Sequence, residues 1–182
     1  MSKNVYQTYK AYVDYAIDEA IKAIKTYIDK QDEKEKMIMD IRVISATHLA
    51  IDFYERLPKS VQGNPVKETL DNKNPVYLDD IYAFRFLNNA LKHNPTMQYF
   101  TEDTNTHMFG AANGRAYFSF PTNFSKDVIW CDLSHFKRAN NSLDDALYER
   151  YSCLLYNSPT EVTFDCLKTS LDKLLQQAET TP

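Results

Sequence analysis

The sequence predicts a mainly helical (α+β) domain: a bundle of four to five helices with inserted strands, in the order ααα-βββ-αα. Three observations lead to this prediction. Apolar residues recur at three- and four-residue steps through residues 5–29, the spacing of one helix face. No glycine or proline precedes Pro58, so nothing breaks the pattern sharply. The 182 residues include only 3 glycines, which favours long elements over a loop-rich β-sandwich.

The first half of the chain predicts three helices. The first covers residues 5–29, and the mixed charge run 29–36 is typical of a solvated helix end or turn. A second apolar stripe runs from Met37 to Phe53 and ends at Pro58, which lacks a backbone donor. Residues 58–75 contain three prolines and a glycine, so we expect a long connection there. The third helix runs from near Leu78 to His93.

Residues 98–133 predict an inserted β-hairpin or three-stranded antiparallel meander. Asn113 and Gly114 stand between two short apolar stretches, and this pair tolerates the positive φ that a two-residue hairpin turn needs. The stretch 127–133 is rich in β-branched and aromatic residues and predicts a third strand.

Two helices follow the insertion. Ser142 and Asp145 form a weak capping-box pattern at the start of the first. Ser158, Pro159 and Glu161 form a strong one at the start of the second, with proline at the first helical position. We therefore expect one domain over residues 1–178 and a flexible tail at 179–182.

Composition narrows the classes of function. The net charge of −4 disfavours a general nucleic-acid binder, although a local basic strip can still bind. The 3 cysteines match no zinc or disulfide spacing, which favours a reduced cytoplasmic compartment. We expect no bound metal or cofactor. Cys153 and Cys166 lie in apolar-rich helical stretches, where buried thiols are usual. No signal peptide and no apolar run of ~18 residues occurs, so we expect no membrane contact.

One helical stretch, residues 82–93, concentrates polar side chains on one side. On a helical wheel, Arg85, Asn89 and His93 stack at successive four-residue steps, and Asn88 and Lys92 flank them. The apolar residues gather on the opposite side. His93 stands at the predicted helix end, a half-exposed position that suits a titratable group.

The stretch FLNNALKHN resembles the signature of the HEPN superfamily, helical bundles of prokaryotic defence and toxin systems. In that motif an Arg and a polar residue precede a His at a helix end. The resemblance implies a homodimer with the two motifs face to face, and RNA cleavage without metal in active members. Here His93 matches the histidine and Asn89 the polar position, whereas Asn88 stands where the family has arginine. In helix count, the resemblance covers about residues 5–95 and 142–177.

The chemistry of such cleavage assigns roles to these residues. Attack by a 2′-OH needs an acid or base near neutral pH, and strong donors or a cation for the charge on the phosphate. His93 would be the acid/base, Arg85 and Lys92 the phosphate partners, and Asn88 and Asn89 the donors. Three interpretations remain for the strip: an ordinary solvent face, a HEPN-like scaffold without activity, and an active ribonuclease.

A second basic stretch offers nucleic-acid contacts. Lys137 and Arg138 adjoin Phe136, and Arg115 precedes them in the chain. Basic residues with aromatic neighbours can pair phosphates and stack bases. His48, by contrast, lies between apolar residues of the second helix, and we expect it to be a satisfied histidine at the boundary of the core.

Two functions from different classes fit these observations. The first is a HEPN-like cytoplasmic protein of a prokaryotic defence, toxin–antitoxin or mobile-element system that binds or cleaves RNA. The second is a non-catalytic, anti-CRISPR-like inhibitor encoded by a phage or mobile element. It would bind a basic host nuclease through an acidic surface rich in tyrosine, because tyrosine is enriched at protein interfaces. The tyrosines concerned are Tyr6, Tyr12, Tyr15 and Tyr27.

Overall fold

The chain folds as a mainly helical domain, as its apolar periodicity predicts. The computed structural model describes residues 3–68, 76–93, 100–102, 107–109, 118–120 and 127–180. Its helices are α1 (Lys3–Lys30), α2 (Glu33–Arg56), the short α3 (Lys59–Gln62), α4 (Val76–His93), the 3-10 helix η1 (Ser134–Phe136), α5 (Ser142–Leu154) and α6 (Thr160–Thr180). Its strands are β1 (Phe100–Glu102), β2 (His107–Phe109), β3 (Phe118–Phe120) and β4 (Asp127–Ile129).

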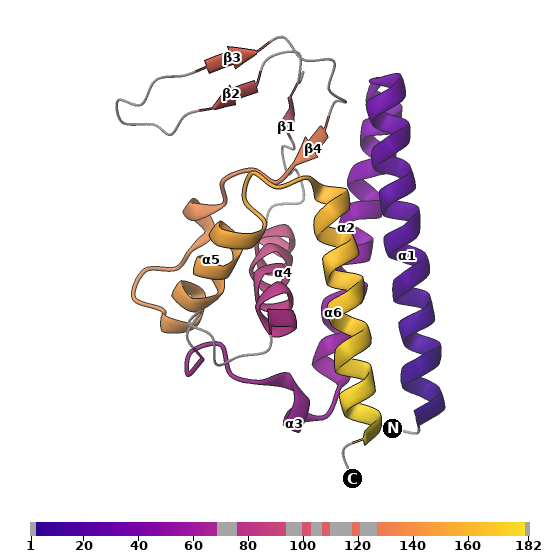
Figure 1. The fold of residues 1–182 in the computed structure, drawn as a ribbon, viewed down its shortest axis with the longest axis vertical. Coiled ribbons are helices and arrows are strands. Elements are labelled where there is room, and N and C mark those ends of the chain that lie inside the picture. The colour runs from indigo at the N-terminus through magenta and orange to yellow at the C-terminus, as the bar shows by residue number, and fades with distance from the viewer. Residues whose placement is uncertain are drawn as a thin grey trace.

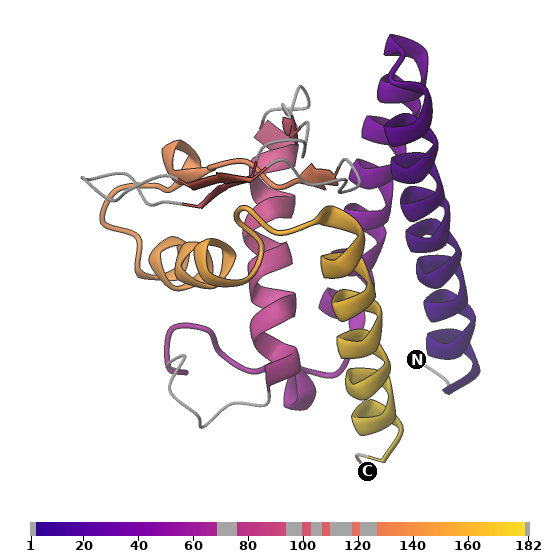
Figure 2. The ribbon, with the colours of Figure 1, turned by 45° about the horizontal axis from the view of Figure 1, so that its top comes forward.

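Four of these helices form an antiparallel bundle. α1 and α4 run in one direction, and α2 and α6 run in the other (Figures 1 and 2). Each helix packs against two neighbours, in the cyclic order α1, α2, α4 and α6. α5 packs on the outer side of α4, and the strands lie at the end of the bundle opposite to the chain termini (Figure 1).

The charge run after α1 supplies the tight turn to α2. Gln31 adopts a positive φ of 54° between the two helices. Asp32 caps α2, because its side chain accepts a hydrogen bond from the backbone N–H of Glu35 at 2.8 Å. This short connection makes α1 and α2 antiparallel neighbours.

Opposite charges join α1 to α6 along their length. The pairs run from Lys10 with Asp172 at 2.5 Å to Lys25 with Glu161 at 3.6 Å, so the numbering falls on α6 as it rises on α1. A side-chain hydrogen bond from Gln7 to Glu179 extends the series. Because of this contact, α6 continues into the residues expected to form a flexible tail and ends at Thr180.

The insertion differs from the predicted three-stranded meander, which the structure does not support. β1 pairs with β4 and β2 pairs with β3, both antiparallel, in two separate two-stranded sheets. Instead of extending β4 to residue 133, the chain turns its backbone to the segment before α6: Trp130 N–H donates to Ser158 O, and Asn157 N–H donates to Trp130 O at 3.0 Å. The Asn113-Gly114 turn lies outside the described residues.

The reason for this early strand end is the burial of Trp130. Its indole is fully buried among Phe84 of α4 and Phe164 of α6, with ring centroids 6.0 Å away in both cases. The indole N–H donates to Thr163 Oγ1 at 2.7 Å. Trp130 therefore anchors the insertion to the helical core.

The start of α5 also differs in detail from its prediction. Asn141, rather than Ser142, caps the helix: its side-chain oxygen accepts hydrogen bonds from the N–H groups of Leu143 and Asp144, both at 3.1 Å. The cap lies one residue earlier because the asparagine side chain reaches two orphan donors of the first turn.

A buried ion pair fastens α5 to α4. Arg150 is 0% exposed, and its Nε lies 2.7 Å from Asp79 Oδ1. Its two other nitrogens donate to the carbonyls of Ala146 and Glu68, at 2.8 and 2.5 Å. The guanidinium also lies 5.2 Å from the ring centroid of Tyr82. One side chain thus joins α5, α4 and the segment after α3.

We expect Arg150→Ala to lower the free energy of unfolding by about 3 to 5 kcal/mol, because the substitution leaves the Asp79 carboxylate buried without its partner. Urea denaturation followed by circular dichroism measures this change. The matched control is Lys168→Ala, which removes the more exposed pair with Asp18 and should cost less than about 1 kcal/mol. Equal losses in the two variants would contradict the prediction.

Candidate nucleic-acid interface

α4 packs against α2, α5 and α6, and few of its described side chains reach the surface. Between Ile81 and Lys92, every side chain is buried except those of Arg85, Asn89 and Lys92. These three follow one another at four- and three-residue steps, so they lie on one line along the helix. We call this line the α4 edge.

Two cations stand on the α4 edge. Arg85 is half-buried, with its guanidinium 5.7 Å from the ring centroid of Tyr54. Burial raises the pKa of Tyr54 to about 12, so its ring stays a neutral phenol below Arg85. Lys92 is exposed. Within the described part of the chain, neither cation forms an ion pair with a carboxylate. No carboxylate of the described residues therefore neutralises either charge.

The charge of Lys92 acts on the carboxylate of Asp52, which already has other hydrogen-bond partners. Asp52 accepts hydrogen bonds from Arg56 Nε, at 2.8 Å, and from the hydroxyl of Tyr9. These bonds, first that from Arg56, together with the charges of Arg56 and Lys92, hold the Asp52 pKa below its usual value. Because Arg56 and Tyr9 occupy Asp52, it does not cancel the charge of Lys92 by direct contact.

Asn88 lies away from the α4 edge, contrary to its expected place on the polar strip. It is only 3% exposed, and its side-chain oxygen is hydrogen-bonded to Nδ1 of His48 on α2. The reason for the difference is that α2 packs over that side of α4. The helical wheel could not show this contact.

Two of the predicted site residues cannot be placed in three dimensions. His93 is the last residue of α4, but its side chain lies outside the described residues, and so does Arg115. The predicted acid/base therefore has a known position along the helix and no described surroundings.

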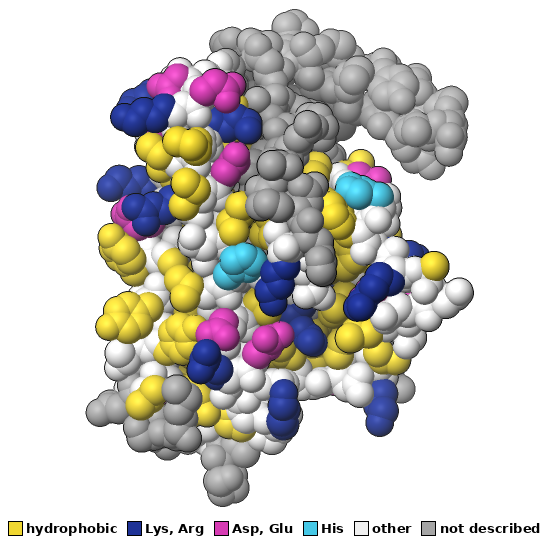
Figure 3. Space-filling model, turned by 180° about the vertical axis from the view of Figure 1, so that it is seen from behind, with side chains coloured by type: hydrophobic (Ala, Val, Ile, Leu, Met, Phe, Trp, Pro, Cys, Tyr) yellow, Lys and Arg dark blue, Asp and Glu magenta, His cyan; other side chains and the backbone are white. Residues whose placement is uncertain are grey.

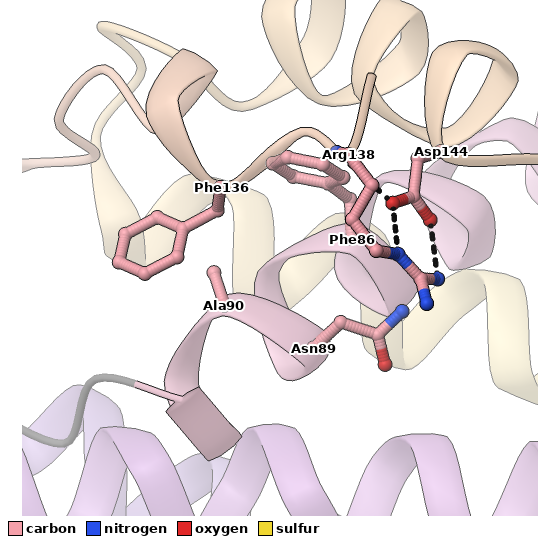
Figure 4. Close-up of a pocket in the computed structure, with 6 residues that line it drawn as sticks. All are labelled: Phe86, Asn89, Ala90, Phe136, Arg138 and Asp144. Atoms are coloured by element: carbon pink, nitrogen blue, oxygen red, sulfur yellow. Dashed lines mark hydrogen bonds and ion pairs between the residues drawn. The ribbon is translucent and has the colours of Figure 1, made fainter. Parts of the chain in front are cut away.

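A cavity of about 280 Å³ opens beside the α4 edge (Figure 4). Asn89 points toward the guanidinium of Arg138, and Phe136 of η1 lies over Ala90 (Figure 4). Amides and guanidinium groups can hydrogen-bond to the edge of a base, and an aromatic ring can stack on its face. The lining residues are Phe86, Asn89, Ala90, Phe136, Arg138 and Asp144.

The basic residues on the far side of this cavity are neutralised by carboxylates. Arg138 Nε and Nη2 lie 2.6 and 2.9 Å from the two oxygens of Asp144, and Lys137 Nζ lies 2.9 Å from Asp145. Arg138 therefore offers donors at the cavity, whereas the predicted patch of Lys137 and Arg138 carries little net charge. The unpaired charge of the site comes from the α4 edge.

Lysine and arginine side chains lie near the middle of the face in Figure 3, beside a histidine and acidic side chains. Hydrophobic side chains lie between them and also follow the edge of the molecule formed by α1 and α2 (Figure 3).

Sequence patterns missed two contributors to the site. His48 was assigned to the core boundary, which matches its half-buried position, but its bond to Asn88 depends on a contact between helices distant in sequence. Tyr54 lies below Arg85. It directly follows the apolar stripe of α2, and no sequence pattern indicated its contact with Arg85. The cysteine expectation was wrong: Cys153 and Cys166 are both exposed, because they occupy the outer faces of α5 and α6.

Comparison with known proteins assigns no family or function to this chain. No family model, curated protein or solved structure matches this chain. Among the described residues, no cluster of three or more His, Cys, Asp or Glu side chains could hold a metal ion. In that same part of the chain, no helix has the length and apolar character needed to cross a membrane.

The pair of Arg138 and Asp144 gives a pH-dependent prediction. The hydrogen bonds from Arg138 lower the pKa of Asp144, so the folded state binds fewer protons than the unfolded state near the ordinary aspartate pKa of about 3.9. The stabilisation is present above that pH and is lost as the pH falls through the lower, folded-state pKa. The stability advantage of the wild type over Asp144→Asn should therefore shrink below about pH 4, measured by denaturation at several pH values. A difference that is independent of pH would contradict this assignment.

Proposed function

We propose that this chain binds single-stranded RNA along the α4 edge, as its resemblance to HEPN-like bundles of prokaryotic defence, toxin–antitoxin or mobile-element systems implies. One observation carries the proposal: Arg85 and Lys92 stand on one line with Asn89, and neither cation forms an ion pair with a carboxylate among the described residues. Backbone phosphates are the ligands that such cations bind in nucleic acids.

The cavity next to the α4 edge supports a single-stranded ligand rather than a duplex. Bases of single strands can leave their stack and insert into a pocket, whereas bases within a helix cannot. The cavity of about 280 Å³ combines the Phe136 ring with the polar groups of Asn89 and Arg138. An unstacked base would enter this cavity while the adjacent phosphates contact Arg85 and Lys92.

The surroundings of Asn88 favour binding over cleavage. This residue stands where the family motif has arginine, and its side chain is buried against His48. It therefore does not reach a phosphate on the α4 edge, and Arg85 and Lys92 must supply the charge. A second copy that places its own α4 edge opposite the first would complete a longer basic groove, and a homodimer is part of this proposal.

The double variant Arg85→Ala/Lys92→Ala should lower RNA affinity by about tenfold at physiological salt. It should also reduce the slope of log affinity against log salt by about 0.7 for each lost phosphate contact. Fluorescence anisotropy with a labelled, unstructured RNA oligonucleotide measures both quantities.

The control for this experiment is Lys25→Ala/Lys168→Ala, which removes the same charge from the seam between α1 and α6. We expect its affinity and salt slope to equal those of the wild type. Equal losses in both double variants would show that only net charge matters, and the absence of wild-type binding would reject the proposal.

RNA should remain intact when it is incubated with the purified protein in the presence of a chelator, because binding without cleavage is proposed. Gel analysis of a structured RNA tests this for the wild type, for His93→Ala and for His48→Ala. Cleavage by the wild type that disappears in His93→Ala would instead establish a metal-independent ribonuclease with His93 as its acid/base. Cleavage lost only in His48→Ala would move that role to His48.

A further inference from the structure

The outer face of α1 and α2 carries a second surface that the RNA proposal does not use. Tyr12 and Tyr15 of α1 are 64% and 65% exposed, and Met37 and Ile41 of α2 are 59% and 56% exposed. Contiguous exposed patches of such side chains, rather than single ones, mark interaction sites on soluble proteins. Tyrosine, methionine and arginine are also the residue types enriched at protein interfaces.

This surface is hollowed along α1. One depression of about 370 Å³ lies between the two helices, and a second of about 480 Å³ adjoins it and shares Tyr9 and Tyr12 with the first. Together they extend from Val5 to Ala16, about 16 Å along the helix axis, which is the length of three helical turns. We call this the α1–α2 groove; its lining residues are Val5, Thr8, Tyr9, Tyr12, Tyr15, Ala16, Arg42, Ser45 and Leu49.

The floor of the α1–α2 groove is held in place before any partner binds. The Tyr9 hydroxyl donates to Asp52, and the Tyr9 ring meets Phe53 edge to face at 5.7 Å between centroids. The Arg56 guanidinium lies 5.7 Å from the Tyr9 ring centroid and also pairs with Asp52. The free-energy cost of ordering this part of the groove on binding is therefore small.

The charge of the α1–α2 groove is positive. Arg42 and Tyr15 both line the depression of about 370 Å³. Arg42 is exposed and forms no ion pair with any carboxylate in the described ranges. Of the acidic residues of α1, Asp14 and Asp18 pair with Lys10 and Lys168, and Glu19 pairs with Lys22. Among the described residues that line the two depressions, Arg42 is the only charged one.

We propose that the α1–α2 groove binds an acidic amphipathic helix of another protein. Its apolar side chains would occupy the two depressions along α1, and a carboxylate would pair with Arg42. An amphipathic helix uses apolar anchors spaced over three or four residues, which suits a groove three turns long. The charge complement of Arg42 sets the sign of the partner.

The same charge argues against a second copy of this chain in the groove. An interface related by a twofold axis brings identical surfaces together, so each copy would present Arg42 and no free carboxylate to the other. An acidic helix removes that unpaired charge, whereas a second copy doubles it.

The probe is a labelled 15-residue helix with leucine on one face and glutamate on the other, compared with a peptide in which every glutamate is lysine. We expect the acidic peptide to bind the wild type at least about tenfold more tightly, by fluorescence anisotropy. This preference opposes the net charge of −4, which on its own attracts the basic peptide. Arg42→Glu should invert the preference.

The control is Lys168→Glu, which makes the same change of charge on α6 and should leave the preference intact. Circular dichroism checks that both variants are folded. Equal binding of the two peptides, binding of neither, or an unchanged preference in Arg42→Glu would overturn the proposal. Sedimentation showing a dimer that dissociates in Arg42→Glu would overturn it in favour of a second copy.

Discussion

The position of α4 at the centre of the molecule depends on the buried ion pair between Arg150 and Asp79. A charged side chain at 0% exposure is stable only with its partners in place, and Arg150 has a carboxylate, two backbone carbonyls and the ring of Tyr82. These contacts fix α5 and the segment after α3 against one side of α4, while α2 and α6 cover the others. Between Ile81 and Lys92, this packing leaves only the α4 edge at the surface, and the candidate interface is there.

Charge is distributed unevenly over this framework, and that distribution separates structural from functional residues. On the seam between α1 and α6, lysines and acidic residues pair repeatedly, which aligns the two helices and leaves little net charge. Beside the cavity, Arg138 and Lys137 are also paired. The cations that stay unpaired in the described part of the chain include Arg85 and Lys92 on the α4 edge and Arg42 in the α1–α2 groove. An overall acidic protein thus presents local positive sites of two kinds, one beside a polar cavity and one within an apolar groove.

The α4 edge and the α1–α2 groove are linked through Asp52. This carboxylate accepts the hydroxyl of Tyr9 on the groove floor and the guanidinium of Arg56, and its pKa also responds to the charge of Lys92. The two surfaces therefore share one fixed anion between them. This arrangement keeps the groove floor ordered, and among the described residues Lys92 has no direct carboxylate partner. Each surface thus keeps the charge that its proposed ligand requires.

The sequence by itself determined the helical class, the approximate helix spans and the line of polar residues on α4, because these depend on apolar periodicity and on residues close together in the chain. The exposure of Tyr12 and Tyr15 was likewise predictable from their place outside the apolar stripe of α1. Only the tertiary structure decided that Asn88 is buried against His48 and that β1 pairs with β4. It also decided which cations stay unpaired. Each of these depends on groups brought together from distant parts of the chain, where a local pattern cannot show which neighbour covers a side chain or neutralises its charge.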